Sequence, residues 1–232
     1  MNSWARCATR PVRTALCAAS AAALTSCGGS FCVGVDGCGG TNPLPNVTLT
    51  GTAATGRALA SAAVSVSCTQ GTGTALSDGG GNYSITLSAA LPCVLTVTSG
   101  ATTLHTVAFS GGTFNTTPET ELMLVYLAAQ LGTTENALLT GFPTNATFQQ
   151  ALANATNVLA AQTAVVANLQ QHYSVTLSVP AFLTTPFIAG QAGIDSDLDA
   201  LTTAGVIDAN GMPDPAAVSL LSAAGTARPL GQ

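Results

Sequence analysis

The feature that most constrains the fold of this 232-residue chain is a change of hydrophobic period near residue 116. Before that point, apolar and polar residues alternate over short runs, as in β-strands with one buried face, and turn residues recur roughly every 8–12 residues. After it, apolar residues recur at three- and four-residue spacings, which is typical of amphipathic helices. The sequence therefore predicts an α+β protein, with a β domain over residues 47–116 and a helical region over residues 117–232.

The β region is expected to contain strands that alternate between a buried and an exposed face. Val64, Val66 and Cys68 share one face of such a strand, with serines between them. The expected strands are Val47–Thr52, Ala63–Cys68, Gly73–Ser77, Asn82–Leu87, Cys93–Thr98, Thr102–Phe109 and Thr113–Asn115.

The helical region opens on a clear start signal. Thr117 is the expected N-cap and Pro118 the first helical residue, and acidic residues follow near the positive end of the helix dipole. Residues 122–131 are apolar nearly all round, so this helix is expected to be buried. Further helices are expected over Asn145–His172, Ser196–Ala204 and Pro215–Ala224.

The first 26 residues have the three parts of a secretory signal. Arginines at positions 6, 10 and 13 form a basic start, residues 15–24 are apolar, and small residues lead to a cysteine, Cys27. The apolar run is shorter than the roughly 20 residues that a membrane-spanning helix needs. Residues 1–26 are therefore predicted to be a signal peptide.

The segment Leu24-Thr25-Ser26-Cys27 resembles the lipobox of bacterial lipoproteins. That resemblance implies cleavage before Cys27, a diacylglyceryl group on its thiol, labelling by palmitate, and anchorage in a membrane. Gly28 stands where an Asp would favour the inner membrane of a Gram-negative cell, so the outer membrane is the expected location in the cell envelope. An ordinary secretory leader cut nearby is the alternative.

Residues 27–46 are predicted to be a flexible tether, because glycines follow Cys27 and prolines precede the first strand. Four further cysteines remain after the tether's first residue, and an even number in an exported protein favours disulfides. The preferred pairs are Cys32–Cys38 and Cys68–Cys93, among three possible pairings. A metal site is a weaker alternative, since the chain has no CxxC pair and only two histidines.

Two segments of the β region resemble the carboxypeptidase regulatory-like domain. The first is Gly51-x5-Arg57-x-Leu59-Ala60-x-Ala62-Ala63-Val64-Ser65-Val66, and the second is Asp78-Gly79-Gly80-Gly81-Asn82-Tyr83-Ser84-Ile85. The resemblance implies an immunoglobulin- or transthyretin-like (prealbumin-like) β-sandwich. Ser61 and Ala62 stand where the family's opening has a glycine and an alanine, so the first turn is expected to differ. Asp78 and Asn82 are interpreted as turn residues around glycines that permit a positive φ.

Charge narrows the range of partners. Without residues 1–26 the chain keeps two arginines against ten acidic residues, a net charge of −8, and it contains no lysine. Binding to nucleic acid is not expected, because neutralising phosphates needs several basic residues. The membrane, through the lipid on Cys27, is the expected partner, together with an unidentified protein or glycan.

No catalytic set is recognisable, and no cofactor or metal site is predicted. Asp195, Asp197 and Asp199 alternate, but Ala200 and Val206 occupy positions where an EF-hand loop requires Gly and Glu, so the acids are interpreted as helix-capping residues, with Asp195 or Ser196 as the N-cap. His105 is expected on a strand and His172 at a helix C-terminus. The main hypothesis is a non-catalytic envelope lipoprotein with a binding or structural role, and the alternative is a hydrolase with an unrecognised site in the helical region.

Overall fold

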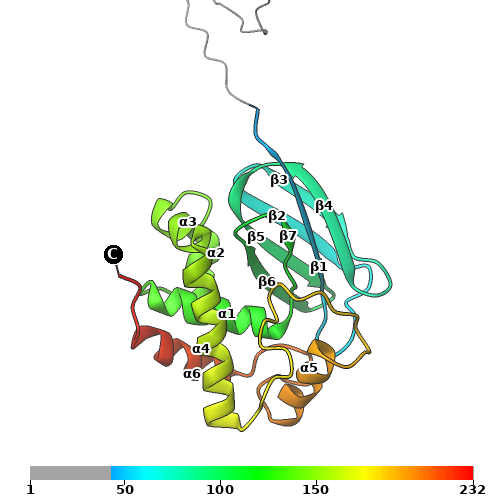
Figure 1. Cartoon of the computed structure of the whole chain (residues 1–232), viewed down its shortest axis with the longest axis vertical. Helices are drawn as coiled ribbons and strands as arrows, with labels where there is room; N and C mark the ends of the chain where they lie inside the picture. The colour runs from blue at the N-terminus through cyan, green and yellow to red at the C-terminus, as the bar shows by residue number, and fades with distance from the viewer. Residues whose placement is uncertain (1–42, 232) are drawn as a thin grey trace, which may run out of the picture. The chain divides into compact units, whose positions relative to one another are not determined.

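Strands occupy the first half of the folded chain and helices the second (Figure 1). The computed structural model describes residues 43–231, which belong to one compact unit. The predicted signal peptide, Cys27 and the Cys32–Cys38 pair lie outside the described residues. The predicted α+β class is confirmed, and the change from strands to helices near residue 116 occurs inside this unit.

The seven strands of the described chain form two sheets, with orders β4-β1-β7 and β3-β2-β5-β6. In the first sheet β1 is antiparallel to β4 and parallel to the short β7, and the second sheet is antiparallel throughout. The strands are β1 (Asn46–Thr52), β2 (Ala63–Gln70), β3 (Thr72–Leu76), β4 (Asn82–Ser88), β5 (Ala90–Ser99), β6 (Thr102–Ala108) and β7 (Gly112–Thr113).

Buried and exposed residues alternate in β2 and β4, as predicted, but they do not alternate in β5 and β6. Val64, Val66 and Cys68 of β2 are buried, as predicted, while the residues between them are more exposed. In β6, by contrast, Thr106, Val107 and Ala108 are consecutive and all fully buried. Successive residues point to opposite faces of a strand, so both faces of β6 are covered, and two of the helices contact it.

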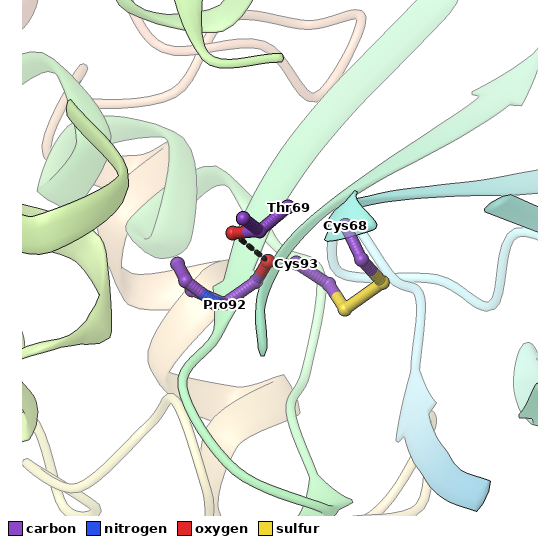
Figure 2. Close-up of a disulfide and its surroundings, with 4 residues drawn as sticks. All are labelled: Cys68, Thr69, Pro92 and Cys93. Carbon is purple, nitrogen blue, oxygen red and sulfur yellow. Dashed lines mark hydrogen bonds between the residues drawn. A yellow bond between two sulfur atoms is a disulfide. The ribbon is translucent and has the colours of Figure 1, made fainter. Parts of the chain in front are cut away.

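A disulfide joins Cys68 of β2 to Cys93 of β5, as the sequence predicted (Figure 2). The two cysteines are directly opposite each other in the antiparallel register. Beside them, the Thr69 hydroxyl donates a hydrogen bond to the carbonyl of Pro92, with an O–O distance of 3.5 Å. The covalent link therefore joins the two central strands of the four-stranded sheet near their ends, and both cysteine side chains are buried there.

Helix α1 is the centre of the helical part (Figure 1). Residues 118–129 are all buried, as expected for a helix that is apolar on every side, and α1 contacts β6, α2, α4 and α6. The close contact between α6 and α1 requires Gly225 of α6, because a Cβ atom there would overlap the carbonyl oxygen of Tyr126 in α1. The helices are α1 (Pro118–Gln130), α2 (Glu135–Gly141), α3 (Ala146–Ala153), α4 (Ala155–Tyr173), α5 (Ile194–Thr203) and α6 (Pro215–Thr226).

The helix boundaries differ from expectation in four places. The single helix expected over 145–172 is divided into α3 and α4, because the Asn154 side chain accepts hydrogen bonds from the N–H groups of Thr156 and Asn157 and so caps α4. Helix α5 begins after Gly193 rather than at Ser196, whose hydroxyl instead accepts from the Gly193 N–H. Helix α6 continues through Gly225, and α2 was not predicted.

One hydrophobic core runs through both halves of the folded chain. Buried side chains of the two sheets belong to the same cluster as those of the helices, from Leu49 of β1 to Leu221 of α6. The described helices include none that has the length and apolar character to cross a bilayer. The sheets and helices therefore stabilise each other rather than folding around separate cores.

Candidate metal centre

The first turn of α1 lies against the open side of β6, and their contact fixes His105. β6 is an outer strand of its sheet, paired only with β5. The Glu121 carboxylate accepts a hydrogen bond from the His105 backbone N–H, and the Thr120 hydroxyl donates to the His105 carbonyl at 2.8 Å. Side chains of α1 thus satisfy the backbone groups that an additional strand would otherwise bond.

The His105 side chain meets two carboxylates at this contact. Its Nδ1 atom lies 3.0 Å from Oε1 of Glu121, and this is the one ion-pair geometry among residues 43–231. Glu135, the first residue of α2, completes the group, since one potential ligand atom from each of the three residues lies within 4.8 Å of the others. We refer to His105, Glu121 and Glu135 as the acidic triad.

The acidic triad is partly shielded from water. The side chains of His105 and Glu121 are 19% and 9% exposed, and Oε1 of Glu135 is buried without a hydrogen-bond partner. Burial, together with the nearby Glu121 carboxylate, raises the pKa of Glu135 to about 9. The group therefore needs a positive charge or a proton between its carboxylates in order to be stable at neutral pH.

A second acidic group lies on a different side of the first turn of α1. Glu119 is fully buried, neither of its carboxylate oxygens has a hydrogen-bond partner, and Asp195 and Asp197 of α5 are close enough to repel its charge. Burial, with a smaller contribution from the two aspartates, raises the pKa of Glu119 to about 7. Because Glu119 and Glu121 are two residues apart on a helix, their side chains do not face each other. Glu119 lies near the aspartates of α5, and Glu121 contacts His105.

The aspartates of α5 hold the segment between α4 and α5 in place. Asp197 accepts hydrogen bonds from the N–H groups of Ser178 and Val179, at 2.8 and 2.9 Å. Asp195 is buried, with Oδ1 unpartnered, whereas Asp199 is exposed. The interpretation of this run as helix-capping acids is wrong for Asp197, which bonds the preceding connector, and Gly193 rather than Asp195 or Ser196 is the N-cap of α5.

The other residues singled out from the sequence lie apart from the acidic triad. His172 is exposed in the last turn of α4, as predicted. Asp78 accepts hydrogen bonds from the N–H groups of Gly80 and Asn82, both at 2.8 Å, and from the side-chain amide of Asn82, which is the largest cause that lowers its pKa. Gly81 has a φ of 79°, so this glycine supplies the positive φ that the turn before β4 requires.

Sequence reasoning did not assemble the acidic triad. It placed His105 on a strand and treated Glu119 and Glu121 as acids of a first helical turn, but α2 and the position of Glu135 were missed. A signal for α2 was present, because Thr134 followed by Glu135 is a cap and a first-turn acid, and the Thr134 hydroxyl accepts from the Ala137 N–H. No local pattern relates residue 135 to residue 105.

The chain was also compared with known proteins. No family model, no curated protein and no solved structure matches it.

Proposed function

We propose that the chain is an envelope lipoprotein, held to a membrane by lipid on Cys27, with a non-catalytic binding or structural role. The observation that carries this proposal is the order of segments at the N-terminus. A basic and apolar leader ends in Leu24-Thr25-Ser26-Cys27, and Gly28-Gly29-Ser30 follows. Several acyl chains on one cysteine hold a protein at a membrane far more firmly than one chain does.

The folded part supports a tethered arrangement. β1 begins at Asn46, 19 residues after Cys27, at the end of the folded body opposite α5 (Figure 1). A flexible tether that enters there would hold the folded part clear of the lipid surface. The net charge of −8 opposes binding to anionic headgroups, so the lipid would supply the attachment.

We further propose that the two sheets form a transthyretin-like β-sandwich of the carboxypeptidase regulatory-like type. The hairpin around Asp78 and Asn82 supports this, since it leads into β4 at the position that the resemblance implies. The disulfide between β2 and β5 would stabilise one sheet of that sandwich.

The positions of the two histidines do not support a hydrolase of the Ser-His-Asp type. A Ser-His-Asp mechanism needs a serine within hydrogen-bond reach of an imidazole. In the described residues, His105 contacts Glu121, no hydrogen bond joins either histidine ring to a serine, and His172 lies exposed in the last turn of α4.

Replacing Cys27 tests the anchor. Cys27→Ser is expected to abolish palmitate labelling and to release the protein from the membrane fraction, whereas the matched Cys38→Ser variant should remain labelled and membrane-bound. Continued labelling of Cys27→Ser would contradict the proposal.

Replacing Gly28 tests the proposed location in the outer membrane. A Gly28→Asp variant expressed in a Gram-negative host should move from the outer-membrane to the inner-membrane fraction of a density gradient. Gly29→Asp is the matched control for the added charge. An unchanged distribution of Gly28→Asp would contradict the outer-membrane assignment while leaving the lipid anchor in place.

A further inference from the structure

The acidic triad brings together the ligand types of a transition-metal site. An imidazole nitrogen and two carboxylates come from three elements, β6, α1 and α2, and one potential ligand atom of each lies within 4.8 Å of the other two. A tetrahedral Zn²⁺ site has ligand bonds of roughly 2.0–2.2 Å, so its ligand atoms are roughly 3.3–3.6 Å apart. Nδ1 of His105 lies 3.0 Å from Oε1 and 3.3 Å from Oε2 of Glu121, so these atoms need to separate by only a few tenths of an ångström to hold the ion.

Two of the three ligands are oriented before any ion binds. Oε2 of Glu121 accepts the His105 backbone N–H, which leaves Oε1 facing the imidazole. The carbonyl of His105 is held by the Thr120 hydroxyl. Contacts of this kind around a metal ligand fix its direction and commonly change metal affinity by about 10–100-fold when they are removed.

The charges at the acidic triad are not balanced by arginine. Arg57 and Arg228 are the two arginines of the described chain, and no ion pair joins either to a carboxylate there. Oε1 of Glu135 is buried without a partner. A cation between the carboxylates would satisfy this oxygen and remove the repulsion between Glu121 and Glu135.

We infer that the acidic triad binds one Zn²⁺ ion through Nδ1 of His105 and the carboxylates of Glu121 and Glu135. The ion takes the place of the Nδ1 proton, since a metal ligand must be deprotonated. Three protein ligands leave a fourth position for water. Ca²⁺ fits less well, because it takes 6–8 oxygen ligands, and an imidazole favours a transition metal.

The alternative occupant is a proton shared between Glu121 and Glu135. Metal-free, full-length lipidated protein in detergent micelles should distinguish the two, by calorimetric titration with ZnCl₂ and by the visible absorption of added Co²⁺. We expect one Zn²⁺ to bind per chain and the Tm to rise with ZnCl₂ concentration. Bound Co²⁺ should give the intense visible absorption that indicates a low coordination number.

Two variants locate the site and two control for other binding. Glu135→Gln and His105→Gln should each weaken Zn²⁺ binding at least tenfold. Glu119→Gln, which removes a buried carboxylate two residues from Glu121, and His172→Gln, which removes the exposed histidine, should bind like the parent. Glu135→Gln keeps the shape of the side chain, so it remains informative if His105→Gln fails to fold.

Either of two results would overturn the inference. The first is the absence of saturable Zn²⁺ binding by the parent, and a Glu135→Gln variant more stable than the parent at pH 7 would then identify a shared proton. The second is Zn²⁺ binding of equal strength in the parent, Glu135→Gln and His105→Gln.

Discussion

Glu121 of α1 accepts the backbone N–H of His105 on the side of β6 that has no partner strand. A single side chain thus blocks the open side of the sheet and joins the first turn of the central helix to it. The Thr120 hydroxyl completes the contact at the His105 carbonyl. An outer strand with free backbone groups invites pairing with other chains, and here the helix covers it.

This contact predicts a difference between two variants of Glu121. Both Glu121→Ala and Glu121→Gln remove the charge, but only glutamine keeps an oxygen that accepts from the His105 N–H. In EDTA, Glu121→Ala should be less stable than Glu121→Gln by about 1–3 kcal/mol, the cost of an unpaired buried donor. Urea denaturation measures the difference, and amide exchange at His105 should be faster in Glu121→Ala. Equal stability and equal exchange would show that the bond is unimportant.

The raised pKa of Glu119 leads us to predict that stability depends on pH. Its pKa is raised to about 7 in the folded state from 4.5, so between these values the folded protein holds a proton that the unfolded chain has lost. Stability should therefore fall as pH rises from about 4.5 to about 7, by roughly 3 kcal/mol for this group. Burial of the Glu119 carboxylate is the largest cause of this raised pKa, and Asp197 and Asp195 of α5 add to it.

The Glu119→Gln variant isolates this effect from other titrating groups. Its free energy of unfolding in EDTA, measured from pH 4 to 8, should lack the parent's decline over this window, so the difference between the two proteins should grow with pH. Parallel curves would show that Glu119 does not titrate in this range.

The Cys68–Cys93 disulfide spans 25 residues of sequence. Closing a loop of that length in the unfolded chain is worth about 3 kcal/mol in the chain-entropy model. A Cys68→Ala/Cys93→Ala double variant should lose about this much free energy of unfolding. The Cys32→Ala/Cys38→Ala double variant, which removes the disulfide predicted in the tether, should keep the parent value. Equal losses in both would contradict the assignment.

The contact between α6 and α1 leaves no room for a side chain at Gly225. A Cβ atom there would overlap the Tyr126 carbonyl oxygen and lie 2.9 Å from Cβ of Ala129. Gly225→Ala should cost roughly 1–3 kcal/mol of overpacking, more than the ~1 kcal/mol of helix propensity it gains. Gly79→Ala, where a Cβ atom meets open space, is the control and should be near neutral. Thermal unfolding measures both, and a stabilised Gly225→Ala variant would refute this prediction.

Because the sheets and the helices share one hydrophobic core, we predict that the β region does not fold alone. Thr106, Val107 and Ala108 of β6 are all fully buried, and α1 and α3 both contact this strand. A fragment of residues 43–116 loses that cover and should lack the dispersed amide NMR spectrum of a fragment of residues 43–231. A folded 43–116 fragment would instead show that the β region is an autonomous domain.

Much of the local structure was predictable because it depends on neighbouring residues. The alternation in Val64, Val66 and Cys68 placed β2, and Thr117 with Pro118 placed the start of α1. The break at Asn154 was missed because the apolar spacing continues across it, while one asparagine side chain decides whether the helix restarts. The cover on both faces of β6 was missed because it comes from helices that follow later in the chain.

The sequence by itself determined the α+β class and the start of α1, since each rests on residue type and spacing along the chain, and it favoured Cys68–Cys93 among three possible pairings. Only the tertiary structure decided that the sheets and helices share one core and that His105, Glu121 and Glu135 meet. Packing α1 and α2 beside β6 brings together residues that are 16 and 30 positions from His105 along the chain, and no periodic pattern records a contact between separate elements.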